Sequence, residues 1–249
     1  MTAALGMGIR KGDTVISLGT SGTFYGRTSV GIKDETGAIN GYADAADGFL
    51  PMITTLNAAK VTDAFRRILR ASTEEFDTLA LDTTPGARGL VLVPYLDGER
   101  SPNFPDATGH LMGLRSDVEP SQIARASIEG VICGLLEGGD LLASLGLETD
   151  GRLIVTGGAS KSRAYRQILA DLTGKPVWTC DVAEAAAAGA AVQAAAALSG
   201  RHTSAVAEEW QPNYQIVAEP NAHAFDRAEE VREAYRKAQR LATGREDND

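Results

Sequence analysis

The chain has little of the chemistry that marks metalloproteins, disulfide-linked proteins and membrane proteins. Its 249 residues include only two cysteines, Cys133 and Cys180, and these have no metal-ligand spacing. The three histidines are scattered and have no catalytic partner nearby in the sequence. We see no signal peptide and no apolar run of membrane length. The sequence therefore predicts a cytoplasmic protein without a disulfide framework, a structural metal or a membrane anchor.

Positive charge is also scarce. Lysine and arginine total 24 against 33 aspartates and glutamates, which gives a net charge of −9. Such a protein does not attract nucleic acid or anionic membranes non-specifically, so we expect neither as a partner. A nucleotide would have to be bound locally, by backbone N–H groups, helix N-termini and Mg²⁺. Hydrophobic residues make up 43% of the chain, and helix-like segments alternate with strand-like ones, which predicts an α/β fold with a substantial core.

A glycine turn between two strand-like segments is the first candidate site. Residues 15–18 and 23–25 favour strands. The turn between them consists of Gly19, Thr20, Ser21 and Gly22. Glycine allows a close approach of a ligand, and free N–H groups and hydroxyls would line a small concavity that suits phosphate. An ordinary β-hairpin turn is the alternative reading of this segment on its own.

A second glycine turn follows the strand-like segment 152–156. Gly157 and Gly158 open the turn, and a helix is predicted over residues 162–172. The glycines would let a base or ribose lie against the backbone, while the helix start presents unpaired donors. The sequence is neither a Walker A motif nor a dinucleotide fingerprint, so a plain strand-to-helix turn stays open.

Two neighbouring segments could also contact a ligand. The apolar periodicity of residues 54–70 predicts an amphipathic helix, whose start at Thr55 to Asn57 is a second candidate anion site. The irregular loop 95–109 carries Asp97, Glu99 and Arg100, which we interpret as an ion-paired brace rather than as ligand contacts.

Three further helices are predicted. Residues 120–145 form a long apolar helix whose glycines mark close packing and whose Glu129 needs a structural partner. Residues 183–198 form an alanine-rich helix that can approach a neighbour closely, particularly at Gly189. A polar helix over residues 222–241 precedes a tail, 244–249, that we expect to be frayed.

Four segments together resemble the carboxy-terminal domain of FGGY-family sugar kinases, which belong to the actin-like ATPase superfamily. Residues 17–24 are similar to the family's second phosphate motif, and residues 94–102 to its central loop. Residues 109–129 fit the family signature, and residues 156–162 fit its adenosine motif. The resemblance covers the whole chain, and within the family it is greatest to the xylulokinases.

The resemblance implies an actin-like (ribonuclease H-like) α/β domain over residues 1–243, with a mixed five-stranded sheet flanked by helices. It implies ATP and Mg²⁺ as cofactors. By this resemblance the phosphate-binding turn comprises Gly19, Thr20, Ser21 and Gly22, of which the first three meet the β- and γ-phosphates. Gly157, Gly158 and Ala159 line the ribose and adenine, Ser162 stands at a polar adenine contact, and Asn57 lies near the nucleotide.

The resemblance also implies that part of the enzyme is missing. In this family the catalytic aspartate and most sugar-binding residues belong to an amino-terminal domain, and the aspartate normally falls just before a stretch like residues 2–6. Asp13, Asp44 and Asp47 lack that context, so we assign no catalytic residue. We expect the chain alone to bind ATP or ADP weakly, if at all, and to phosphorylate no sugar. For the complete enzyme, the resemblance favours D-xylulose as the sugar substrate. A homodimer and a non-catalytic nucleotide-binding module (a pseudokinase or sensor) stay open.

Overall fold

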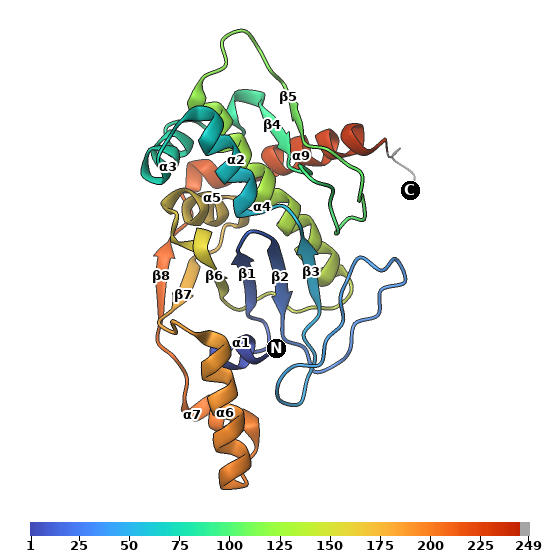
Figure 1. Ribbon diagram of the computed structural model, residues 1–249, viewed down its shortest axis with the longest axis vertical. Helices are drawn as coiled ribbons and strands as arrows, with labels where there is room; N and C mark the ends of the chain where they lie inside the picture. The colour runs from blue at the N-terminus through green and yellow to red at the C-terminus, as the bar shows by residue number, and fades with distance from the viewer. Residues whose placement is uncertain (245–249) are drawn as a thin grey trace.

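A mixed sheet lies at the centre of the computed structural model, which describes residues 1–244 (Figure 1). Six strands follow one another in the order β3-β2-β1-β6-β7-β8, so the α/β class and the mixed sheet are confirmed, but the predicted count of five is wrong. β1 pairs antiparallel with β2 and parallel with β6. The bounds are β1 Thr14–Leu18, β2 Gly22–Gly26, β3 Met52–Thr55, β6 Leu153–Thr156, β7 Val177–Cys180 and β8 Tyr214–Ala218.

The sixth strand is the edge strand β8, which pairs antiparallel with β7. Its central residues Gln215 and Ile216 are exposed, so it lacks the buried face that makes a strand recognisable in sequence. The buried strand predicted at 90–94 exists as β4 (Val91–Val93), but it pairs with β5 (His110–Met112) in a separate two-stranded sheet. The sequence predicted this strand and not its partner.

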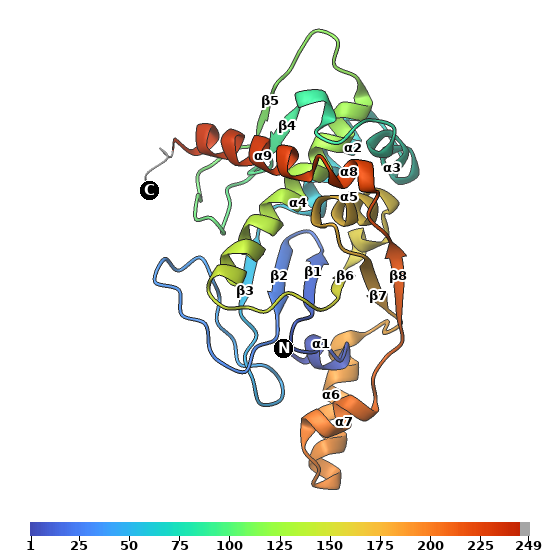
Figure 2. The ribbon, with the colours of Figure 1, turned by 180° about the vertical axis from the view of Figure 1, so that it is seen from behind.

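Alternate residues of the central strands point to opposite faces of the sheet, as the two-residue period of a strand requires. Val15, paired with Tyr25 and Ile154, packs in a small cluster with α1. Ile16, paired with Phe24 and Val155, belongs to the main core with α4 and α5. Figure 2 shows α4 crossing the sheet on the main-core side. Both faces of the central strands are therefore covered.

The helices agree with the sequence over most of their length, with two corrections. The helix predicted over 54–70 begins only at Ala59, because residues 52–55 continue as β3. The single helix predicted over 222–241 is divided into α8 and α9 at Asp226 and Arg227. Residues 245–249 of the predicted tail lie outside the described residues. The bounds are α1 Thr2–Gly6, α2 Ala59–Leu69, α3 Thr73–Leu81, α4 Pro120–Ser144, α5 Arg163–Thr173, α6 Ala185–Ser199, α7 Thr203–Glu209, α8 Ala222–Phe225 and α9 Ala228–Thr243.

A buried ion pair on α4 anchors the segment between α3 and β4. Glu129 accepts hydrogen bonds from Arg125 Nε at 2.6 Å and from the Gly86 N–H at 3.0 Å. Arg125 also donates through Nη1 to the carbonyl oxygen of Thr83 at 3.2 Å. Burial raises the pKa of Glu129, and Arg125 and the Gly86 N–H act against this rise. The structural partner expected for Glu129 is thus confirmed.

Helices α1 and α6 pack backbone against backbone, as the small residues of α6 predict. A Cβ atom built on Gly189 would lie 1.8 Å from the Thr2 carbonyl oxygen, and one on Gly6 would lie 2.0 Å from the Ala185 carbonyl oxygen. Figures 1 and 2 show α6 and α7 extending away from the sheet at the end where α1 lies. Contact with α1 is therefore a main attachment of this extension.

We expect Gly189→Ala to lower the free energy of unfolding by about 2 kcal/mol, because overpacking outweighs the gain in helix propensity. Urea denaturation measures this change. The control is Ala194→Gly on the exposed face of the same helix, where the loss of propensity alone should cost about 1 kcal/mol. A Gly189→Ala variant that was more stable than the parent would contradict the packing described.

Among residues 1–244, none of the helices combines the length with the apolar character needed to cross a lipid bilayer.

Candidate functional site

The two glycine turns open into one cleft with a volume of about 860 Å³. β1 and β6 are parallel neighbours, so the turns that follow them lie at the same edge of the sheet. Gly19 and Thr20 line the cleft from the first turn, and Gly158, Ala159 and Ser162 line it from the second. The structure thereby brings together five of the nine residues predicted from the sequence.

Gly157 allows the two turns to approach. Its φ is +89° and its ψ is 173°, a conformation that is essentially restricted to glycine. A Cβ atom at this position would lie 2.7 Å from the Leu18 carbonyl oxygen. By contrast, a Cβ atom on Gly158 would meet nothing within 4 Å. Gly157 therefore has a structural role at the edge of the cleft, while Gly158 leaves open space within it.

The first turn presents free donors. The carbonyl oxygens of Gly19 and Thr20 accept hydrogen bonds from the N–H groups of Ala59 at 2.9 Å and Ala58 at 3.2 Å. The Thr20 and Ser21 N–H groups have no hydrogen-bond partner within residues 1–244, and both residues are exposed. Because its carbonyl groups are held by the start of α2, the turn can offer these N–H groups to an anion.

The predicted anion site at the start of α2 is wrong. The N-cap is Ala58, which provides no side-chain hydrogen bond, and its N–H donates to the first turn instead. Asn57 is only 2% exposed and does not line the cleft. Its Nδ2 donates to the Gly98 carbonyl oxygen at 2.7 Å and to Glu99 Oε2 at 2.9 Å. Ser21 and Gly22 also lie outside the cleft lining.

The brace predicted in the loop 95–109 is present in part: Asp97 is ion-paired, whereas Glu99 and Arg100 are held by hydrogen bonds. Glu99 accepts hydrogen bonds from the Asn57 side chain and from the Leu56 and Arg100 N–H groups. Burial raises the pKa of Glu99, and these hydrogen bonds oppose the rise. Asp97 pairs with Lys60 of α2 at 3.1 Å. The loop therefore fixes the segment between β3 and α2, which in turn supports the first glycine turn.

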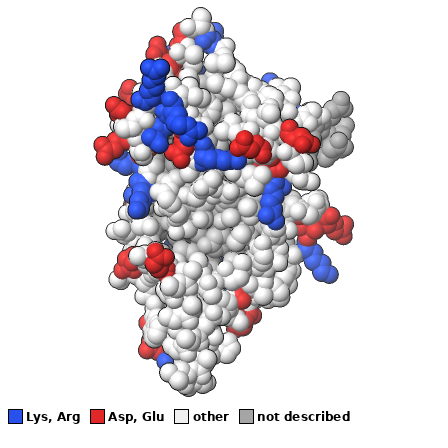
Figure 3. All heavy atoms as spheres, viewed as in Figure 1, with Lys and Arg blue, Asp and Glu red and all other residues white. Residues whose placement is uncertain are grey.

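Helices α2 and α3 form the cleft wall that the sequence did not predict. Figure 3 shows lysine and arginine side chains over the upper part of this face, interspersed with acidic ones. The charged residues of the cleft lining are Arg66, Lys161, Arg163, Asp63, Glu74 and Asp77. The cleft lining thus carries three cations and three carboxylates, which is less acidic than the chain as a whole with its net charge of −9.

Asp77 joins α3 to the start of α5. Its Oδ1 accepts a hydrogen bond from Ser162 Oγ at 2.6 Å, and its Oδ2 accepts one from the Arg163 N–H at 2.7 Å. Ser162 Oγ in turn accepts from the Tyr165 N–H at 3.1 Å, so that Ser162 is the N-cap of α5. A carboxylate at a helix N-terminus is favourable, because the N–H groups there lack intrahelical partners.

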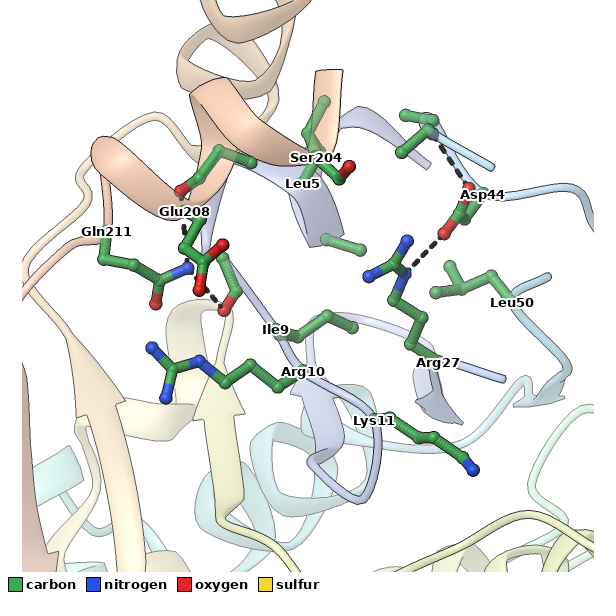
Figure 4. Close-up of a pocket in the computed structure, with 15 residues that line it drawn as sticks. Leu5, Ile9, Arg10, Lys11, Arg27, Asp44, Leu50, Ser204, Glu208 and Gln211 are labelled. Carbon is green, nitrogen blue, oxygen red and sulfur yellow. Dashed lines mark hydrogen bonds and ion pairs between the residues drawn. The ribbon is translucent and has the colours of Figure 1, made fainter. Parts of the chain in front are cut away.

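A second pocket, of about 240 Å³, lies between α1, α7 and the segments around Arg10 and Arg27 (Figure 4). Two of the cations that line it pair with acidic neighbours: Arg27 pairs with Asp44 at 2.6 Å and Lys11 pairs with Glu148 at 2.8 Å. Asp44 also accepts hydrogen bonds from two N–H groups of its own turn, so it has a structural role there. None of the residues predicted to bind a nucleotide lines this pocket.

Comparison with known proteins supports the four motifs. The model of the FGGY family of carbohydrate kinases, C-terminal domain, matches residues 14–198. The chain belongs to the FGGY family of carbohydrate kinases. This match runs from the first residue of β1 through nearly all of α6, so both glycine turns lie within it.

Named members of the FGGY family are similar over most of this chain. Xylulose kinase from Streptomyces rubiginosus is 38% identical over 229 residues, which cover 92% of the chain and 45% of that protein. The Haemophilus influenzae xylulose kinase is 33% identical over 196 residues, covering 78% of the chain and 40% of that protein. The chain thus spans less than half the length of these relatives.

Solved structures of FGGY kinases share the fold. Xylulose kinase from Bifidobacterium adolescentis aligns with a TM-score of 0.80 and 36% identity, over 96% of this chain and 46% of that one. Glycerol kinase from Plasmodium falciparum, solved with ADP, aligns with a TM-score of 0.81 at 18% identity, which is a similarity of fold alone. The actin-like fold expected from the sequence is thereby confirmed.

The cleft residues fit a nucleotide of the kind that FGGY kinases use. Free N–H groups and nearby cations suit phosphates, and the open backbone at Gly158 suits a flat base or a ribose. Within residues 1–244 there is no group of three or more His, Cys, Asp or Glu residues that could hold a metal ion. Mg²⁺ does not require such a group, because it keeps several waters and binds largely through substrate phosphates.

Proposed function

We propose that the chain is the ATP-binding half of a sugar kinase that transfers the γ-phosphate of ATP to a sugar hydroxyl. The observation that carries the proposal is the single cleft in which Gly19 and Thr20 face Gly158 and Ala159. D-Xylulose, giving D-xylulose 5-phosphate, is the sugar we favour, because relatives named xylulose kinase cover most of this chain at up to 38% identity.

In this proposal the described residues bind and orient the nucleotide. The Thr20 and Ser21 N–H groups hold the terminal phosphates, and Gly158 and Ala159 lie along the ribose and adenine. Mg²⁺ bound to the phosphates would neutralise charge during in-line transfer. Phosphoryl transfer depends mainly on such positioning and electrostatic stabilisation, so this half would supply much of what the reaction needs on the nucleotide side.

The general base is proposed to come from the amino-terminal half of the kinase. Asp13 and Asp44 are the most buried carboxylates near the start of the sheet, but arginines engage both of them. Burial would raise the pKa of Asp13, but hydrogen bonds from Arg152 and Arg10 outweigh it and hold that pKa below its ordinary value. A base works best with a pKa near the working pH, so neither carboxylate suits the role.

The remaining predicted properties belong to the same proposal. We place the kinase in the cytoplasm, with ATP or ADP and a sugar as partners and with neither nucleic acid nor membrane as a partner. Net charge −9 supports the absence of polyanionic partners. We also propose that the protein forms a homodimer, which sedimentation measurements can test.

Titration of the ¹⁵N-labelled chain with ATP and Mg²⁺ tests the proposal. We expect weak binding, with a dissociation constant on the order of 1 mM, corresponding to about −4 kcal/mol. Chemical shifts should change at Thr20, Ser21, Gly158 and Ala159 and not at the second pocket around Arg27. With D-xylulose and ATP the chain alone should form no ADP. Absence of shifts at 10-fold this concentration, or sugar phosphorylation by the chain alone, would contradict the proposal.

A further inference from the structure

Asp77 has no role in the function proposed above, although it is the most buried charged residue of the cleft lining. It is 8% exposed and belongs to α3, whereas the groups that hold it belong to the start of α5. Neither the four sequence motifs nor the family comparison draws attention to it. Its carboxylate is held on both oxygens, so its position in the cleft wall is fixed by the fold.

The hydrogen bonds of Ser162 leave it unable to donate to a ligand. A serine hydroxyl has one proton and two lone pairs. The proton of Ser162 is donated to Asp77 Oδ1, and one lone pair accepts from the Tyr165 N–H. An ionised carboxylate, in contrast, has about four acceptor positions and no proton to donate. Two of those of Asp77 are used, so Asp77 has more free acceptor positions than Ser162 has.

The place of Asp77 along the cleft decides which part of a nucleotide it meets. Figures 1 and 2 both show α3 on the side away from the β1–β2 turn, with α2 and α5 between them. The free N–H groups at the β1–β2 turn suit phosphates, and a carboxylate would repel phosphates. Asp77 is bonded to Ser162 and Arg163, which follow the second glycine turn, so it lies at the end of the cleft where the base and the ribose are proposed to lie.

We propose that Asp77 selects the nucleoside by accepting a hydrogen bond from a donor group of the base or the ribose. This inference rests on the proposed function, since it assumes that the cleft binds a nucleotide. A base that places a carbonyl oxygen where adenine has its amino group would meet the carboxylate with its own acceptor. Sites built around a buried hydrogen-bonding group discriminate strongly, because the wrong ligand leaves that group unpaired.

Affinities of the chain for four nucleotides test the proposal: ATP, ITP, 2′-deoxyATP and 3′-deoxyATP, each titrated with Mg²⁺ and followed by NMR. If Asp77 accepts from the base, ITP should bind about tenfold more weakly than ATP; if it accepts from the ribose, one deoxynucleotide should show that loss instead. In Asp77→Asn, the ratio between the affinity for ATP and the affinity for that weaker-binding nucleotide should fall to about threefold or less, because the amide replaces one acceptor by a donor.

Asp82→Asn is the matched control, because it removes a carboxylate at the end of α3 that does not line the cleft. We expect it to retain the nucleotide preference of the parent chain. Retention of the full preference in Asp77→Asn would overturn the proposal. If Asp77→Asn does not fold, equal affinities of the parent chain for all four nucleotides still overturn it. A parent chain that binds none of them refutes the proposed function itself, which is a different result.

Discussion

Replacing Glu129 by alanine is expected to lower the free energy of unfolding by about 3–5 kcal/mol, the range found when one partner of a buried ion pair is removed. Arg125, with a side chain only 4% exposed, would lose the carboxylate that neutralises it. The Gly86 N–H would lose its acceptor as well. A change of this size is a large part of the stability of an ordinary domain, so the variant should unfold at much lower urea concentration.

Two controls separate the charge effect from the loss of volume. Glu129→Gln keeps the shape and one acceptor, and should cost less than Glu129→Ala. The double variant Arg125→Met with Glu129→Leu removes both charges, and we expect it to be within about 1–2 kcal/mol of the parent, because apolar residues can replace buried ion pairs at little cost. A loss below 1 kcal/mol in Glu129→Ala would show that Arg125 finds another partner or water, contrary to the structure described.

Gly157→Ala is expected to lower the stability of the protein, whereas Gly158→Ala is expected to weaken ATP binding without a loss of stability. At Gly157 the backbone conformation is one that alanine tolerates poorly, and the new Cβ atom would press on the Leu18 carbonyl oxygen. Strain of this kind costs about 1–3 kcal/mol, and the clash adds to it. At Gly158 the methyl group meets no protein atom, so stability should change by less than about 0.5 kcal/mol.

The affinity for ATP should depend directly on the residue at position 158. The Gly158→Ala methyl group projects into space along the cleft, and we expect it to weaken ATP binding about tenfold while the protein remains as stable as the parent. Urea denaturation and the same NMR titration measure the two quantities on each variant. If Gly158→Ala binds ATP as well as the parent chain does, the nucleotide does not lie against this turn.

Much of the architecture is predictable because local sequence and tertiary packing agree. The apolar run of α4, with Pro120 at its start, predicts this helix correctly at its first residue and to within one residue at its last. The segment from β6 to α5 is equally clear, since a buried strand, two glycines and the Ser162 cap follow directly. The edge strand β8 was not predictable in this way, because its stability derives from pairing with β7 rather than from a buried face.

The residues of the candidate site also fall into two groups, those that the local sequence predicts and those that depend on long-range packing. Gly19, Thr20, Gly158, Ala159 and Ser162 lie in turns whose composition points to a ligand, and the fold brings them into one cleft. Asp77 lies within an acidic helix and differs from its neighbours only through contacts made by a segment 85 residues later. Asn57 shows the converse case: its residue type suits a cap or a ligand contact, yet its side chain is buried and donates to Gly98 and Glu99. Long-range packing decided both.

The pairing of β1 with β6 has a consequence for how the chain folds. The Arg152 N–H donates to Asp13 across 139 residues of sequence, and the parallel ladder that precedes the two glycine turns begins there. Contacts of such separation form late, because closing a long loop precedes the energy gained from the contacts. During synthesis, the β1–β2 hairpin can form early, but the cleft cannot exist until β6 has left the ribosome. We therefore expect nucleotide binding to be among the last properties acquired, at the step when the sheet gains its parallel centre.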